Sequence, residues 1–383
     1  MLSGGGVDPE SGTDPLSEGG GAAGMLAGSP GITNIGHHTF VYWPLCICRL
    51  SCLASRLDDT VQLAIADRLG EIRYRARPFT HADVLTWPLT ELELSRVKIT
   101  WPSRYQWAPA AIFTETLKAA LAQRGVLQVR PTSQSLPGIV LLACTVDGQA
   151  SKVALDYSDR PDFINQEGLV ESSLYIKLQF RASGYPDPRI IRGGYPPSSR
   201  LYYRYYLALR KRFAHDRHID VLGRFGFKFE GDLRRKAVET LSGAHDIDFV
   251  GHGARVRYSR FLREAAMARL CLDLPGKGPF TFRLPEFLGL GCCLIAPRYP
   301  AALPVDLEAG VHYVAVMPDL SDLLETCRHY LAHDEEREQI ARAGSDYFDR
   351  YLHCDQLGSY YLRSILDRLG TRRDIDATES SLA

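Results

Sequence analysis

The chain has 383 residues, enough for one large or two ordinary domains. Hydrophobic residues make up 45% and charged residues 23%, a composition typical of globular proteins. The 45 Lys and Arg residues balance the 45 Asp and Glu residues, which argues against a nucleic-acid-binding protein, since those usually carry net positive charge or a basic face.

The beginning of the chain has little globular character. Residues 1–36 are rich in Gly, Ser, Pro and Asp, and we expect a disordered extension because such a segment buries too little apolar surface to offset its ordering entropy. Residues 37–60 are ambiguous, since the apolar stretch 40–53 is short and is interrupted by Pro44 and Arg49. The chain contains no run of about 20 apolar residues, which is the length that a membrane-spanning helix needs. We therefore expect a cytoplasmic protein, with peripheral membrane association left open.

The nine cysteines follow no repeating spacing. Cys46, Cys48 and Cys52 cluster, but no second Cys or His pair at zinc spacing accompanies them, so we predict no metal site. Cys292 and Cys293 lie in an apolar run, where buried thiols are expected. A disulfide framework suits small secreted chains, and this chain is not small.

Residues 61–215 are predicted to form a first α/β domain. We expect strands at residues 61–66, 71–74, 138–146, 152–155 and 174–178, and helices at 110–123 and 201–214. Residues 139–143 are continuously apolar, and such runs suit a parallel strand that is covered on both faces. Glycines and prolines at 193–197 indicate a loop near the end of this domain.

From residue 217 onward, short strands and helices alternate. We expect strands at 219–222, 247–250, 270–274, 292–296 and 313–316, and helices at 231–241, 258–269, 284–290, 320–333, 335–350 and 356–369. This alternation predicts a parallel sheet with helices on both faces, over a second domain of residues 216–370 with a flexible tail at 371–383. The expected fold is α/β, with two Rossmann-like parallel-sheet domains that face a cleft.

The strongest motif covers residues 281–297. It reads as a loop, a short helix with Pro285 in its first turn, a glycine break and a buried strand. A helix N-terminus suits a phosphate, and Arg283 adds a guanidinium beside it. Glu286 stands where a carboxylate could accept hydrogen bonds from ribose hydroxyls. The alternative is that both side chains are ordinary capping or surface charges.

This motif resembles the donor-site element of GT-B glycosyltransferases. Residues 312–323 resemble the equivalent run in KDEL-motif O-glucosyltransferases and capsule-associated proteins, and so do 333–336 and 341–344. Similar runs occur in exostosin-like and group 1 bacterial glycosyltransferases. Many group 1 enzymes have a second Glu eight positions after the first, but Leu294 stands there in this chain. The resemblance, which covers residues 219–366, therefore favours the exostosin and O-glucosyltransferase side.

Other candidate donor-binding residues follow the predicted strands of the second domain. A glycine-rich turn at 223–228 carries Arg224 and Lys228, whose cations could pair with a diphosphate. Gly251 ends the next strand and could abut a nucleotide base. Lys277, in a loop rich in Gly and Pro, could balance the charge of a leaving diphosphate. Ordinary turns explain each of these segments equally well.

Asp156 and Asp159 are the candidate catalytic residues of the first domain. They follow a predicted strand, and a carboxylate at a strand end that faces a cleft can deprotonate an acceptor hydroxyl. Asp156 is the preferred base of an inverting reaction, and helix capping is the alternative role for both residues. Lys177 is a cation within an apolar strand, at a position that resembles one near the interdomain cleft of related bacterial enzymes.

The resemblance implies transfer of a sugar, with a UDP-sugar as the preferred donor, to a hydroxyl of a glycan, a lipid-linked molecule or a protein. We expect hexosyl transfer without a metal or other cofactor, because the Asp-x-Asp pair at 246–248 begins a strand rather than ending one. A dinucleotide-binding oxidoreductase is disfavoured, since Gly-x-Gly-x-x-Gly occurs only at residues 19–24. A non-catalytic glycan- or nucleotide-binding protein with the same fold stays the alternative.

Overall fold

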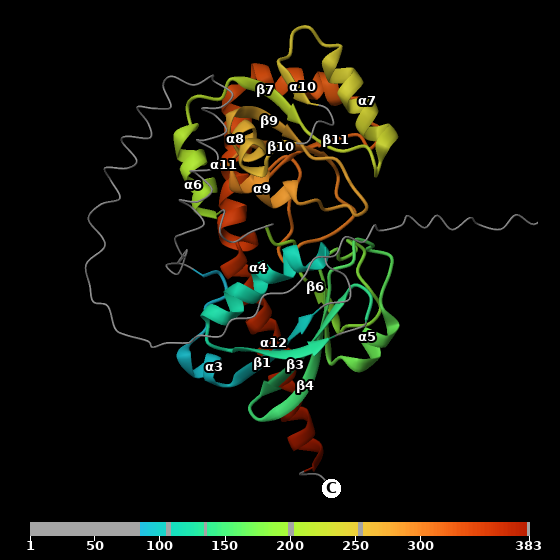
Figure 1. Ribbon diagram of the computed structural model, residues 1–383, viewed down its shortest axis with the longest axis vertical. Helices are drawn as coiled ribbons and strands as arrows, with labels where there is room; N and C mark the ends of the chain where they lie inside the picture. Colours follow the sequence, from blue (N-terminus) through green and yellow to red (C-terminus); the bar gives the residue numbers. More distant parts are fainter. Residues whose placement is uncertain (1–84, 105–108, 134–135, 198–202, 252–255, 381–383) are drawn as a thin grey trace, which may run out of the picture. The chain divides into compact units, whose positions relative to one another are not determined.

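A computed structural model describes residues 85–104, 109–133, 136–197, 203–251 and 256–380 (Figure 1). The strands expected at 61–66 and 71–74, the Gly-rich extension and the cysteine cluster at 46–52 lie outside these ranges. The structure has two β-sheets, which belong to the same compact unit of the chain. No helix in the described ranges is both long enough and apolar enough to cross a membrane.

The first sheet has six strands in the order β2-β1-β3-β4-β5-β6. Their bounds are β1 Val97–Arg104, β2 Leu127–Ser133, β3 Ile139–Val146, β4 Gln149–Asp156, β5 Leu174–Lys177 and β6 Ile190–Arg192. The strands β4, β5 and β6 run parallel, so their carboxyl ends lie at one edge of the sheet. The sequence had not predicted β1, β2 or β6.

The prediction that β3 is a parallel strand is wrong. It pairs antiparallel with both β1 and β4, and its side chains alternate between fully buried and more exposed positions. The cause is the turn Asp147-Gly148, in which both residues have positive φ, 51° and 84°. An Asp-Gly turn of this kind joins antiparallel strands in a tight hairpin. The apolar run at 139–143 was therefore a weaker signal of strand direction than the two residues after the strand.

Helices from both ends of the described chain cover the first sheet. The helices α4, Pro109–Gln123, and α12, Cys354–Ser380, pack against each other and over one face (Figure 1). Trp101 of β1, Leu121 of α4 and Leu362 of α12 are all buried in this core. The first half of α12, which the sequence analysis assigned to the second domain, thus packs in the core of the first sheet. On the other face, the shorter α5, Gln166–Glu171, packs against β4 and β5.

The second sheet is fully parallel, as predicted, with the strand order β11-β10-β9-β7-β8. The strands are β7 Ile219–Gly223, β8 Phe249–Gly251, β9 Ala268–Leu272, β10 Cys293–Pro297 and β11 Val314–Val316. The helix before β9 ends at Met267, so Ala268 and Arg269 belong to the strand rather than to the expected helix. Ala268 is fully buried in the sheet, which explains why the strand begins so early.

Helices cover both faces of the second sheet. They are α6 Tyr203–Arg212, α7 Gly231–Ser242, α8 Tyr258–Met267, α9 Arg283–Gly289, α10 Leu323–Ala332, α11 Asp334–Tyr347 and the π-helical turn η2 Phe348–Leu352. Cys292 packs with α6, α8 and α9 on one face, whereas the adjacent Cys293 packs with α7 and α10 on the other. Both thiols are buried, as predicted for a strand that is covered on both sides.

Candidate functional site

A cavity of about 530 Å³ lies at the carboxyl ends of strands from both sheets. Its charged lining residues are four cations and one carboxylate: Arg224, Arg234, Lys277, Arg283 and Asp159. Aromatic side chains form much of the remaining wall: Tyr195, Phe225, Phe229, Tyr258, Phe261, Phe280 and Phe282. We call this space the cationic cavity. Four of the eight candidate residues from the sequence line it, and the other four do not.

Arg283 reaches the cavity from the first turn of α9 and is held by a buried carboxylate. Its Nε donates to Asp273 Oδ1 at 3.1 Å, and Thr281 Oγ1 donates to the same oxygen at 2.6 Å. The other oxygen of Asp273 accepts from Tyr299 at 3.1 Å. Asp273 is only 1% exposed and directly follows β9. This network fixes the guanidinium of Arg283 at the cavity wall, where it also lies over the Phe225 and Phe282 rings.

Arg234 is a second buried guanidinium at the same wall. It belongs to α7, and its terminal nitrogens donate to the carbonyls of Gly226 at 2.7 Å and Pro275 at 2.6 Å. Its Nε has no hydrogen-bond partner, and no carboxylate lies within ion-pair distance, among the residues that the structure describes. Burial, and then the nearby charge of Arg283, lower the pKa of Arg234 to about 10. Two guanidinium groups therefore lie near the buried carboxylate of Asp273, which forms its ion pair with Arg283.

Arg224 lines the cavity, but its charge is already paired. It follows β7, and its Nε and Nη2 donate to Glu264 of α8 at 2.5 and 3.2 Å. Glu264 also accepts from Arg260 at 2.8 Å. A guanidinium in a bidentate pair keeps few donors for a ligand. Arg224 is thus better placed to shape the cavity wall than to carry the main anion contact.

Glu286 is not among the residues that line the cavity, and its side chain is fully buried. Its carboxylate accepts a hydrogen bond from Tyr258, the first residue of α8, which does line the cavity. Tyr258 also contacts the hydroxyl of Tyr206 at 3.1 Å. Burial and the adjacent Glu286 carboxylate raise the pKa of Tyr258 well above its usual value. Glu286 therefore acts on the cavity through Tyr258.

Lys228 and Gly251 lie outside the cavity lining. Lys228 is exposed, and its Nζ lies over the Phe229 ring at 5.5 Å from the centroid. Gly251 ends β8 beneath the Phe249 ring, which would stand only 2.0 Å from a Cβ at that position. The same ring would lie 2.9 Å from a Cβ at Gly223, so both glycines make room for an aromatic side chain of the chain itself.

Asp159 is the carboxylate of the cavity. It follows β4 by three residues, and burial raises the pKa of its carboxyl, while the charges of Lys277 and Lys177 act in the opposite direction. Lys277 lies on the loop that follows β9, and both residues line the cavity. The Asp159 carbonyl would stand 2.5 Å from a Cβ at Gly278, so only glycine fits at that point of the loop.

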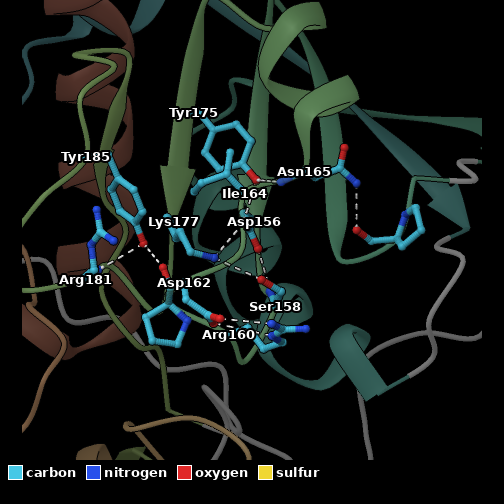
Figure 2. Close-up of polar contacts among 12 residues, drawn as sticks. Asp156, Ser158, Arg160, Asp162, Ile164, Asn165, Tyr175, Lys177, Arg181 and Tyr185 are labelled. Atoms are coloured by element: carbon cyan, nitrogen blue, oxygen red, sulfur yellow. Dashed lines mark hydrogen bonds and ion pairs between the residues drawn. The ribbon is translucent and has the colours of Figure 1, made fainter.

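Asp156, three residues before Asp159, is fully buried and is not among the residues that line the cavity; Figure 2 shows its polar contacts. Its Oδ2 accepts from Tyr175 at 2.6 Å and from Lys177 at 2.8 Å, and its Oδ1 accepts from the Ser158 amide at 2.8 Å. Asp156 and Lys177 are both 0% exposed. Neither aspartate caps a helix, since Asn165 caps the following helix, α5. The carboxylate of Asp156 is therefore enclosed, whereas that of Asp159 faces the cavity.

The group of possible metal ligands found in the described part of the chain does not lie at this cavity. Among the described residues, the cluster that could hold a metal ion is His353, Cys354 and Asp355, none of which lines the cavity. His353 Nδ1 accepts from the Asp355 amide at 3.3 Å, and its Nε2 lies 3.7 Å from the Cys354 sulfur. Because these contacts use opposite nitrogens of the ring, hydrogen bonding explains the cluster.

Two residues of the site were missed in the sequence, although each carries a signal. Arg234 shares one face of α7 with Ala237 and Leu241, so it is a cation at a core position of an amphipathic helix. Asp273 is a carboxylate directly after the buried strand β9. Charged residues are rarely buried unless they are paired or functional, and both positions could have been marked on that ground.

Comparison with known proteins finds a family match over part of the chain. Residues 209–362 match the family described as "Glycosyl transferase-like". The Protein O-glucosyltransferase 2 of Danio rerio is 41% identical over 56 residues, which cover 15% of this chain and 11% of that protein. The chain thus spans about a tenth of the length of that curated relative.

Solved structures show low similarity to the chain. The Anabaena Alr3699/HepE protein in complex with UDP-glucose is 14% identical, with a TM-score of 0.37 over 56% of this chain and 71% of that one. A glycosyltransferase from Rickettsia africae ESF-5 is 8% identical, with a TM-score of 0.37 over 68% of this chain and 82% of that one. The family match over residues 209–362 agrees with the resemblance to glycosyltransferases that the sequence motifs indicated.

Proposed function

We propose that this chain, whose residues 209–362 match the glycosyl transferase-like family, moves a sugar from a nucleotide-sugar donor to a hydroxyl acceptor. The observation that supports this most directly is Arg234. A buried guanidinium with an unpartnered Nε, next to a second guanidinium and with no carboxylate in ion-pair range among the described residues, needs an anion. The diphosphate of a nucleotide sugar supplies two negative groups of suitable size.

Arg234 and Arg283 hold the diphosphate in this proposal, and Lys277 approaches it from the loop after β9. Charge-assisted hydrogen bonds from guanidinium to phosphate are short and strong, and the two arginines are already fixed by carbonyls and by Asp273. Because the cations are in place before the donor binds, they stabilise the charge that develops on the leaving diphosphate. The reaction proposed here needs no metal ion, since these side chains balance that charge.

The nucleobase lies against the aromatic wall. Phe282 is 38% exposed and Phe229 is 42% exposed, which is unusual for rings of this size, and both line the cavity. A flat base covers such rings by stacking. The preferred donor in this proposal is a UDP-sugar, and the group transferred is a hexosyl group, as the resemblance of residues 312–323 to O-glucosyltransferases implies.

Asp159 is the base. Its carboxylate removes the proton from an acceptor hydroxyl, the acceptor oxygen forms a bond to the anomeric carbon, and the bond from that carbon to the diphosphate oxygen breaks with its electron pair. Asp159 is preferred to Asp156 because Asp159 lines the cavity, whereas the carboxylate of Asp156 is fully buried and holds three hydrogen bonds. The raised pKa of Asp159 suits a group that must accept a proton.

Two measurements test the function. The purified full chain is screened for binding of UDP, GDP and their sugars by thermal shift, and then for release of the nucleoside diphosphate with and without hydroxyl acceptors. We expect UDP to raise the melting temperature and at least one UDP-sugar to be turned over. If no nucleotide binds, the donor site is wrong. If nucleotides bind and no sugar is ever transferred or hydrolysed, the chain is a non-catalytic binding protein that retains the fold.

A further inference from the structure

The buried pair of Asp156 and Lys177 has no direct role in the proposed reaction, although it lies directly beneath the proposed base. The two residues end the neighbouring parallel strands β4 and β5 and stand opposite each other in the sheet. Their side chains are 1% and 0% exposed and lie 2.8 Å apart. Buried ion pairs of this kind are often no more stabilising than apolar residues of the same volume. A reason other than stability is therefore needed for their presence.

The pair controls the path of the chain toward Asp159 (Figure 2). Asp156 Oδ1 accepts from the Ser158 amide, and Lys177 Nζ donates to Ser158 Oγ at 3.0 Å, so both residues bind the same serine. The Tyr157 amide donates to Gly138 at 3.0 Å, and the Leu178 amide donates to the Asp156 carbonyl at 2.9 Å. Each residue from 156 to 158 is thus fixed by at least one hydrogen bond before the chain reaches Asp159.

We propose that Asp156 and Lys177 are positioning residues that set the place and the charge environment of the Asp159 carboxylate. This inference rests on the proposed role of Asp159 as the base. The ion pair fixes Ser158, and Ser158 fixes the direction in which Asp159 leaves the strand. Misplacement of a catalytic group by about 1 Å can cost about a hundredfold in rate, so a rigid support of this kind has a direct consequence for turnover.

The charges around Asp159 make the proposal testable through the pH dependence of kcat. Lys277 faces Asp159 from the loop after β9, Lys177 from β5, and Tyr195 from the segment after β6. Lys177 favours the ionised form of Asp159. Removing the Lys177 charge therefore raises the pKa of Asp159.

The test compares Asp156→Asn, Lys177→Met and the double variant, all in the full chain. We expect Asp156→Asn to lower kcat about 10- to 100-fold, with UDP affinity changed less than about twofold. The acid limb of the kcat profile moves to higher pH in Lys177→Met. The double variant avoids an unpaired buried charge, so it folds even where a single variant is unstable, and it still has reduced kcat because Ser158 loses the hydrogen bond from Lys177.

Asp159→Asn, measured beside these variants, separates this inference from the proposed function. If Asp159→Asn keeps full activity, the assignment of the base is wrong. If Asp159→Asn is inactive, while the double variant keeps the wild-type kcat and Lys177→Met does not move the acid limb, only the positioning role is overturned. A loss of melting temperature with unchanged kcat per folded molecule likewise shows that the pair is merely structural.

Discussion

Gln179 and Phe280 are 101 residues apart, yet the side chain of one binds the backbone of the other twice. Gln179 Nε2 donates to the Phe280 carbonyl at 2.9 Å, and the Phe280 amide donates to Gln179 Oε1 at 3.0 Å. Gln179 lies two residues after β5, whereas Phe280 ends the loop that carries Lys277. This amide pair therefore joins an element of the first sheet to a wall of the cationic cavity.

Gln179→Ala leaves the Phe280 amide and carbonyl without their partners in a buried place. Each unsatisfied group costs about 1–3 kcal/mol, so for the two groups we expect a total loss of about 2–6 kcal/mol in the free energy of unfolding. Chemical denaturation measures this loss. Gln166→Ala is the matched control, since Gln166 is exposed and donates only to Ile164 at 3.4 Å. Equal stability of the two variants would show that the amide pair contributes little.

Arg234→Ala should weaken UDP binding about 10- to 100-fold, because it removes a charge-assisted contact to the diphosphate. The control is Arg235→Ala, whose exposed side chain pairs with Asp232 on the outer face of the same helix. Isothermal titration with UDP distinguishes the two. Unchanged affinity in Arg234→Ala would remove the main support for the donor site.

Arg283→Ala should reduce both UDP affinity and stability. It leaves the Asp273 carboxylate buried without its ion-pair partner, which typically costs about 3–5 kcal/mol in the free energy of unfolding. Arg234→Ala removes no ion-pair partner from a carboxylate and should not have this cost. Thermal and chemical denaturation compare the two variants with the wild type. Arg283→Lys keeps the charge and should recover part of the stability. Intact UDP binding in a folded Arg283→Ala protein contradicts the placement of the donor.

The pH dependence of turnover should report Asp159. A base works when deprotonated, so kcat/KM rises with pH through its pKa, and burial moves that limb above the usual range for Asp. Lys277→Met should move the limb further up, because the charge of Lys277 favours the ionised carboxylate. Asp159→Asn should lower kcat about 10²- to 10⁴-fold. Asp162→Asn, an exposed neighbour paired with Arg160, is the control that should leave the profile unchanged.

Gly278→Ala should displace the loop that carries Lys277. The new Cβ would meet the Asp159 carbonyl at 2.5 Å and Gln179 Nε2 at 2.8 Å, and the carbonyl cannot move without shifting the proposed base. We expect kcat to fall at least about tenfold, as for other displacements near reacting groups. Gly226→Ala is the control, since Gly226 lines the same cavity and a Cβ there meets nothing within 4 Å. A fully active Gly278→Ala protein would contradict this close contact.

The sequence alone determined much about the second sheet. Alternating strands and helices predicted that its strands run parallel, and the motif at 281–297 marked Arg283, which lines the cavity, as a donor-binding candidate. These signals are local. The periodicity of hydrophobic residues, the residue types of a turn and a cation at the end of a loop can each be recognised from neighbouring positions in the chain. Arg224 and Lys277 follow predicted strands, which is also a local signal, and both residues line the cavity in the structure.

Only the tertiary structure decided which charged side chains line the cavity and which are enclosed by partners. The sequence analysis preferred Asp156 to Asp159 as the base, yet Lys177, 21 residues from Asp156, pairs with Asp156, and only Asp159 lines the cavity. Arg234 is distinguished from the other two arginines of the cavity because Arg224 and Arg283 pair with Glu264 and Asp273, which are 40 and 10 residues away in the chain. The first half of α12 likewise packs against the first sheet through contacts between residues that are far apart in the chain. Pairing and burial depend on long-range contacts, and a one-dimensional pattern does not contain them.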